Sequence, residues 1–201
     1  SCIRIFLTAP RHGMFEWSEA PPYALNGAFI LDLFRELPFN YPKGWTYNYY
    51  LQYPALTILF YPPLFYFFLA MAYAVFSTSH SVAVGIVIFF LALWAWGVFE
   101  LGKLIAGYWS GIFSAILLFL TPVVIKWSQQ VMLEIPMLAL ATWSLVFVLK
   151  YTEDKRLLFM LAAALMAIAA LYTKQTAIVP ITSIIFGGSG VLFHGGQHLQ
   201  Y

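Results

Sequence analysis

Three ionisable residues are singled out by their surroundings: Glu134 interrupts an apolar run, Lys174 lies between two such runs, and Glu19 lies in the more polar segment that precedes them. A charged side chain at the centre of a bilayer costs about 2.5–3.5 kcal/mol on insertion scales, so charges in such places are often functional. A carboxylate at a membrane surface can take the proton of an acceptor hydroxyl, and a lysine can hold a phosphate group. These three residues are therefore the candidates for chemistry.

Each candidate also has an ordinary structural explanation. Glu134 lies two positions before Pro136, which suits the first turn of a helix, where a carboxylate meets the positive pole. Lys174 separates two apolar runs and could extend its ammonium group to the membrane surface. Glu19 precedes a Pro-Pro pair and could be a simple loop acid. The residue types alone leave these explanations open.

The composition defines the class of protein. Of the 201 residues, 62% are hydrophobic and 9% are charged, against about 25% charged in soluble domains. A soluble domain of this length could not hide so much apolar surface, because it still exposes roughly a third of its unfolded area. A net charge of +2 does not suit binding to nucleic acid, and the single cysteine, Cys2, excludes a disulfide framework. The chain is predicted to be a multi-pass membrane protein.

Long stretches with few or no charges indicate the membrane helices, because about 20 apolar residues cross a bilayer. Since lipid offers no hydrogen-bond partners to the backbone, the predicted fold is an all-α, polytopic transmembrane helix bundle. We expect residues 1–201 to form a single membrane domain that is part of a longer chain. The stretches are Pro54–Ser79, Val82–Phe99, Leu104–Ile125, Val131–Leu149, Leu157–Thr173 and Thr176–Phe193, with about five transmembrane helices over 82–193.

Residues 10–53 are predicted to form a long first outer loop. Within it, apolar residues recur at helical spacing over 26–37, which predicts an amphipathic helix in the membrane interface. Asn26 is the expected N-cap and Pro38 the expected stop. The following stretch, 54–79, either crosses the membrane or is re-entrant, and its three prolines leave that choice open.

The basic residues predict the orientation. Lys103 lies in one short loop, and two lysines and an arginine lie in the loop 150–156, two crossings later. These loops share a side, which the positive-inside rule makes cytoplasmic. Glu134 is then outside, and Lys174, one crossing beyond the second loop, is also at the outer face.

Four segments, in order, resemble the GT-C glycosyltransferases, and in particular glycosyltransferase family 39, which contains protein mannosyltransferases and lipid A aminoarabinose transferases. The segment EAPPYA at 19–24 resembles the acidic motif of the first loop, and FYPPLFY at 60–66 resembles the Pro-Pro-Leu-Tyr-Tyr stretch. The segments QVMLEIPM at 130–137 and LYTKQ at 171–175 resemble the Asp-Met-Pro-Leu-like and Leu-Thr-Lys-Gly-like segments.

The resemblance implies transfer of a sugar from a polyprenyl-phosphate donor to an acceptor hydroxyl, with inversion, at the periplasmic or luminal face. It implies that Glu19 is the general base or its partner, that Glu134 orients the acceptor or shares the proton, and that Lys174 binds the donor phosphate. Tyr23 and Tyr61 are the further candidates for substrate binding. Neither a metal nor a cofactor is expected.

The sequence departs from the family at two of these positions. Glu19 stands where the family has Asp, and a shift of one position would place Ser18 there instead. Tyr61 stands where the aminoarabinose transferases carry a lysine. The assignment of the base is therefore open between two alignments.

The expected partners are a lipid-linked sugar donor, a glycan, lipid or protein acceptor, and membrane lipids, with no nucleic acid. The expected location is an integral position in a bacterial inner or plasma membrane rather than the endoplasmic reticulum, and the chain alone is expected to be inactive. The alternative is a transporter or flippase in which Glu134 and Lys174 line a pathway. Transporters often contain two matching halves, and the sequence shows no such repeat.

Overall fold

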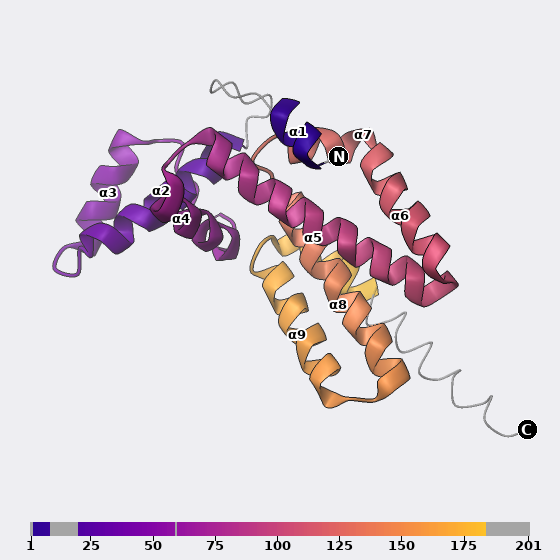
Figure 1. Cartoon of the computed structure of the whole chain (residues 1–201). Helices are drawn as coiled ribbons and strands as arrows, with labels where there is room; N and C mark the ends of the chain where they lie inside the picture. The colour runs from indigo at the N-terminus through magenta and orange to yellow at the C-terminus, as the bar shows by residue number, and fades with distance from the viewer. Residues whose placement is uncertain (1, 9–19, 59, 184–201) are drawn as a thin grey trace, which may run out of the picture.

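The computed structural model describes residues 2–8, 20–58 and 60–183, and these contain helices and turns without any strand, which confirms the predicted all-α class. Figure 1 shows α2, α3 and α4 gathered beside one end of the long helix α5, with α8 packed farther along α5 and α9 packed against α8. The helices are α1 (Cys2–Thr8), α2 (Ala20–Glu36), α3 (Pro42–Gln52), α4 (Leu64–Phe76), α5 (His80–Ala106), α6 (Tyr108–Leu120), α7 (Pro122–Ser128), α8 (Glu134–Asp154) and α9 (Leu157–Leu171).

Two described helices, α5 with 27 residues and α8 with 21, are long and apolar enough to cross a membrane. At 1.5 Å per residue they measure about 40 and 31 Å, against a hydrocarbon core of roughly 30 Å. A third span is present if α6 and α7 are counted together, although they are bent by 67° at their junction. The helices α4 and α9 are apolar but shorter.

The apolar stretch 104–125 is not one continuous helix. Its first residues complete α5, Gly107 turns the chain with a φ of +86°, and α6 then runs back along α5 as far as Leu120. A positive φ favours glycine because the residue has no Cβ. The close packing of this hairpin requires Gly111, where a Cβ would lie 2.6 Å from the carbonyl oxygen of Phe99.

The helices α5 and α8 lie side by side and run in the same direction. The indole of Trp143 donates to the carbonyl oxygen of Leu93 at 2.9 Å. Seven residues later on both helices, Lys150 pairs with Glu100 at 3.5 Å, and Lys103 pairs with the same carboxylate at 3.5 Å. Lys103 and Lys150, one from each of the two basic clusters, therefore meet at one end of the bundle, as expected if the two loops share a side.

The helix α9 returns along α8, so the two form an antiparallel pair. The hydroxyl of Ser144 donates to the carbonyl oxygen of Ala163 at 2.9 Å. Helix α8 ends at Asp154 and is followed by Lys155 in the left-handed conformation, with a φ of 54°. The end of α9 then reaches the beginning of α4, where the amide of Leu64 donates to the carbonyl oxygen of Tyr172 at 3.0 Å. This contact joins the beginning of α4 to the end of α9.

The helix predicted over 26–37 begins six residues earlier, at Ala20, so the prediction of Asn26 as its N-cap is wrong. Asn26 is fully buried inside α2, where its amide nitrogen donates to the Thr57 hydroxyl at 3.1 Å and its oxygen accepts from the Thr57 amide at 3.0 Å. The predicted end is confirmed, because α2 stops at Glu36 before Pro38. These bonds hold the segment that leads into α4.

Candidate functional site

The candidate site is built on an ion pair between Lys174 and Glu134. The ammonium group of Lys174 donates to Oε1 of Glu134, and the two side chains are only 11% and 17% exposed. Glu134 is the first residue of α8, and Lys174 follows the last turn of α9. The antiparallel arrangement of α8 and α9 therefore brings the two residues together.

Local structure fixes the positions of both charges. Glu134 lies in the first turn of α8, where its carboxylate also meets the positive pole of the helix. Lys174 has extended backbone angles, with φ −152° and ψ 133°, and its carbonyl oxygen accepts from the amide of Ala177 at 3.0 Å. The chain thus leaves the helical path at Lys174, and the side chain is directed to Glu134 rather than to the membrane surface.

One of the predicted tyrosines, Tyr61, lies beside this pair, and the other, Tyr23, packs against Tyr61. The ammonium nitrogen of Lys174 is 5.5 Å from the ring centroid of Tyr61, a distance at which a cation is attracted to an aromatic face. The Tyr61 ring meets the ring of Tyr23 edge to face at 5.4 Å, and Tyr23 lies 6.4 Å from Tyr66. Tyr23 and Tyr66 are almost completely buried. Helix α2, the segment before α4 and α4 itself therefore contribute an aromatic wall to the site, formed by Tyr23, Tyr61 and Tyr66.

The second oxygen of the Glu134 carboxylate, Oε2, is buried and has no hydrogen-bond partner among the described residues. A buried acceptor left without a donor costs about 1–3 kcal/mol, and more when it is charged. An acceptor hydroxyl, a substrate group or a water molecule that donates to Oε2 would remove this cost. The site can thus offer a lysine cation to a phosphate and a carboxylate oxygen to a hydroxyl.

The structure brings together four of the five predicted site residues, Glu134, Lys174, Tyr61 and Tyr23. The fifth, Glu19, lies outside the described residues, as does Ser18. Sequence reasoning missed Asn26 as a positioning residue. The helical spacing of Tyr23, Asn26 and Ile30 was a usable signal, because it places the amide on the buried face of α2.

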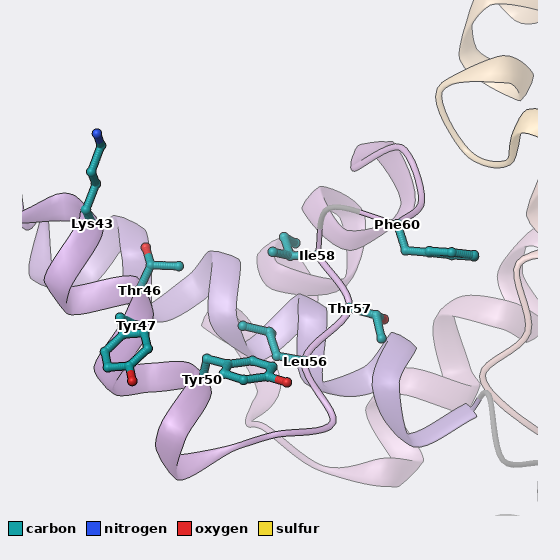
Figure 2. A pocket seen from close by; sticks show the side chains of 8 residues that line it. All are labelled: Lys43, Thr46, Tyr47, Tyr50, Leu56, Thr57, Ile58 and Phe60. Atoms are coloured by element: carbon teal, nitrogen blue, oxygen red, sulfur yellow. The ribbon is translucent and has the colours of Figure 1, made fainter.

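A cavity of about 650 Å³ opens next to the site, between α3 and the segment that precedes α4. Figure 2 shows Tyr50 and Leu56 close together in its lining, with Lys43 on α3 far from Phe60. The Phe60 ring meets Tyr61 at 4.8 Å. The cavity wall is therefore continuous with the aromatic wall beside Lys174.

An apolar helical bundle with a buried lysine–carboxylate pair at one end defines an integral membrane protein with a polar site near the end of its helices. Residues 61–199 match the family model described as dolichyl-phosphate-mannose-protein mannosyltransferase. The chain belongs to this family, and it is therefore a membrane glycosyltransferase that uses a lipid-linked sugar donor. The transporter alternative is not favoured. No curated protein and no solved structure matches the chain.

Proposed function

We propose that this protein transfers a sugar from a polyprenyl-phosphate donor to an acceptor hydroxyl, with inversion, at the outer face of the membrane. The observation that carries the proposal is the buried pair of Lys174 and Glu134 beside Tyr61, with one carboxylate oxygen left without a donor. The family supplies the reaction class, and these residues supply groups suited to its two substrates.

Lys174 binds the donor phosphate in this proposal. An ammonium group has three donors, so the bond to Glu134 leaves others for the phosphate oxygens. As the bond between the anomeric carbon and the phosphate oxygen breaks, negative charge develops on the leaving polyprenyl phosphate. A preorganised cation in a partly buried place stabilises that charge better than water does.

Glu134 orients the acceptor through Oε2, which accepts a hydrogen bond from its hydroxyl. The acceptor oxygen forms the new bond to the anomeric carbon as the phosphate leaves, and the hydroxyl proton passes to Glu19 or to Glu134. Glu19 directly precedes Ala20, the first residue of α2, and Tyr23 on that helix lies in the aromatic wall. A single displacement inverts the anomeric centre without a covalent intermediate.

The position of α4 supports a shared face for the first loop and the site. Leu64, at the start of α4, bonds to Tyr172 beside the site, and α4 ends at Phe76, shortly before α5 begins. In both contacts between the parallel helices α5 and α8, Leu93–Trp143 and Glu100–Lys150, the partners are 50 positions apart in sequence. By the same spacing, Glu134 lies level with Val84, near the beginning of α5. Both ends of α4 therefore lie at the site's end of the bundle, and its 13 residues, about 20 Å, are short for a crossing.

The direct test is sugar transfer by the full-length protein in lipid nanodiscs, with a panel of polyprenyl-phosphate sugars and hydroxyl acceptors. Glu134→Gln should lower kcat by about 100-fold or more, the usual range for an acid–base group. Glu153→Gln is the matched control, because it removes an exposed acid at the other end of α8. Full activity of Glu134→Gln, or no transfer from any such donor, would overturn the proposal.

A further inference from the structure

A second, smaller cavity lies between α2 and α3, away from the ion pair. It measures about 300 Å³ and is lined by two carboxylates, two carboxamides and three aromatic rings. We call it the α2–α3 pocket. Neither the family match nor the proposed transfer site accounts for it, and its chemistry differs from that of the larger, mainly apolar cavity on the other side of α3.

The two carboxylates of the pocket are held in fixed directions. The Tyr49 hydroxyl donates to Oδ2 of Asp32 at 3.0 Å, and the Trp45 indole donates to Oε2 of Glu36. Burial and the neighbouring Asp32 raise the pKa of Tyr49, so its hydroxyl retains the proton that it donates. Asp32 and Glu36 are one helical turn apart and thus share a face of α2. Each carboxylate keeps a second oxygen with no hydrogen bond to the described residues.

The two carboxamides add groups that can both donate and accept. Gln52 donates to the hydroxyl of Tyr53 at 3.2 Å, which leaves its carbonyl oxygen available. Asn48 is exposed and its side chain forms no hydrogen bond with the described residues, although it lines the pocket. An amide has two donors and an acceptor, so Asn48 can bind neighbouring hydroxyl groups of a ligand.

The aromatic rings form a row along α3. Trp45 and Tyr49 have ring centroids 5.3 Å apart, and Tyr49 and Tyr53 are 5.0 Å apart. These residues recur every fourth position, so they share one face of the helix. Rings with polar edges offer an apolar surface beside hydrogen-bonding groups. A pyranose has the matching form, with C–H groups on its faces and hydroxyls around its rim.

We infer that the α2–α3 pocket binds one neutral or amine-bearing sugar residue of a glycan acceptor. The polar lining does not suit a lipid chain, and the two carboxylates repel a phosphate or an acidic sugar. The volume is at the small end of ligand pockets, roughly 300–1,000 Å³, which suits a single ring. Only the assignment of this sugar to the acceptor rests on the proposed function.

The spacing along α2 agrees with an extended acceptor. Tyr23 lies in the aromatic wall of the transfer site, and Asp32 lies nine residues later on the same helix. Nine residues of α-helix span about 14 Å. A glycan of a few residues, free or carried by a lipid or a protein, could therefore occupy the pocket while its terminal hydroxyl reaches the transfer site.

The test measures sugar binding directly, by saturation-transfer NMR on the full-length protein in lipid nanodiscs. The probes are the methyl glycosides of glucose, galactose and mannose, together with glucosamine and glucuronic acid. At least one neutral or amino sugar should bind, and glucuronic acid should not. Asn48→Ala and Glu36→Gln should weaken that binding about tenfold.

The choice of variants separates binding from folding. Asn48→Ala removes no hydrogen bond within the described structure, so the contact between α2 and α3 remains intact. Tyr47→Phe is the matched control, because Tyr47 lies on α3 but lines the other cavity and should leave sugar binding unchanged. The inference is overturned if no neutral or amino sugar binds, if Asn48→Ala binds as well as the wild type, or if glucuronic acid binds best.

The same variants distinguish this inference from the proposed reaction. Glu134→Gln should lower transfer by about 100-fold or more and leave the Asn48-dependent sugar binding intact. Asn48→Ala should raise KM for a glycan acceptor about tenfold while kcat stays unchanged. If the wild type binds sugars through Asn48 but transfers none from any polyprenyl-phosphate donor, the proposed function fails alone. If transfer occurs without Asn48-dependent binding, the inference fails alone.

Discussion

Lys174 and Glu134 form an ion pair across 40 positions of sequence, because α9 returns antiparallel to α8 and ends beside its first turn. The pair is largely buried, and it lies where the beginning of α8 and the end of α9 meet the aromatic wall at Tyr61. One interaction therefore serves the packing of the bundle and gives the candidate site both of its charges.

Exchange of the two charges separates these roles. Glu134→Lys or Lys174→Glu alone leaves two like charges together, and we expect each to destabilise the fold by about 3–5 kcal/mol, the cost of breaking a buried pair. The double exchange restores the pair, apart from roughly 0.3–1 kcal/mol for a cation at a helix N-terminus. It should recover thermal stability in nanodiscs but no sugar transfer. Recovery of both would show that the pair is purely structural.

The amide of Asn26 is expected to control the position of Tyr61. Asn26→Ala removes both hydrogen bonds to Thr57 and leaves the backbone amide of Thr57 without its acceptor. This should lower the free energy of unfolding by about 1–3 kcal/mol. Tyr61 lies four positions after Thr57 and contacts Lys174, so movement of Thr57 should displace Tyr61 and weaken donor binding. The KM for the donor should therefore rise even under conditions in which the variant remains fully folded. Unfolding curves and donor titrations would measure the two effects. Thr57→Ser is the control, because it keeps both bonds, and equal KM values for all three proteins would contradict the prediction.

Composition and hydrophobic stretches were sufficient to predict the helical membrane class, and ionisable residues beside apolar runs were sufficient to select Glu134 and Lys174. Neither signal could predict the role of Asn26. Helical periodicity reports which face of a helix is buried, but the partner of Asn26 is 31 positions away. An asparagine next to the loop therefore resembled an N-cap, and only the position of Thr57 decides otherwise.

The division of the stretch 104–125 was missed for a similar reason. Hydropathy is continuous across Gly107, so it could not show that the chain reverses there. Glycine was the available signal, since Gly102 and Gly111 face each other across the hairpin, where a Cβ on Gly102 would lie 2.9 Å from Cα of Gly111. Small residues permit this close approach of membrane helices.

Gly111→Ala should destabilise the protein because the new methyl group would collide with a backbone oxygen rather than a flexible side chain. Overpacking of this kind costs about 1–3 kcal/mol. Gly85→Ala is the matched control, because its Cβ would meet only Phe6, at 3.9 Å, and alanine is a better helix former than glycine. Thermal unfolding in nanodiscs should rank Gly85→Ala at or above the wild type and Gly111→Ala below it. The reverse order would mean that α5 and α6 do not pack as described.

The arrangement of α4 predicts which faces of the membrane three exposed positions occupy. With Cys2 replaced by serine, single cysteines at Lys43, Thr78 and Lys155 can be labelled in intact cells with an impermeant thiol reagent; all three side chains are exposed. Lys43, on α3, precedes α4 in sequence, and Thr78 follows it. Both should react from outside, because both ends of α4 lie at the site's end of the bundle. Lys155 follows α8 at the opposite end and should react only after permeabilisation.

The three labels give different answers if the proposal is wrong. Reaction of Lys43 and Thr78 from opposite sides would mean that α4 crosses the membrane, and α3 would then lie on the other face from Lys174. Reaction of Lys155 alone in intact cells would keep the shared face but reverse the orientation, so the acceptor would be cytoplasmic. The contacts within the bundle are the same in both orientations. The predicted orientation, which reaction of Lys155 in intact cells would reverse, therefore depends only on the few basic residues near Glu100, because these assign that end of the bundle to the cytoplasm.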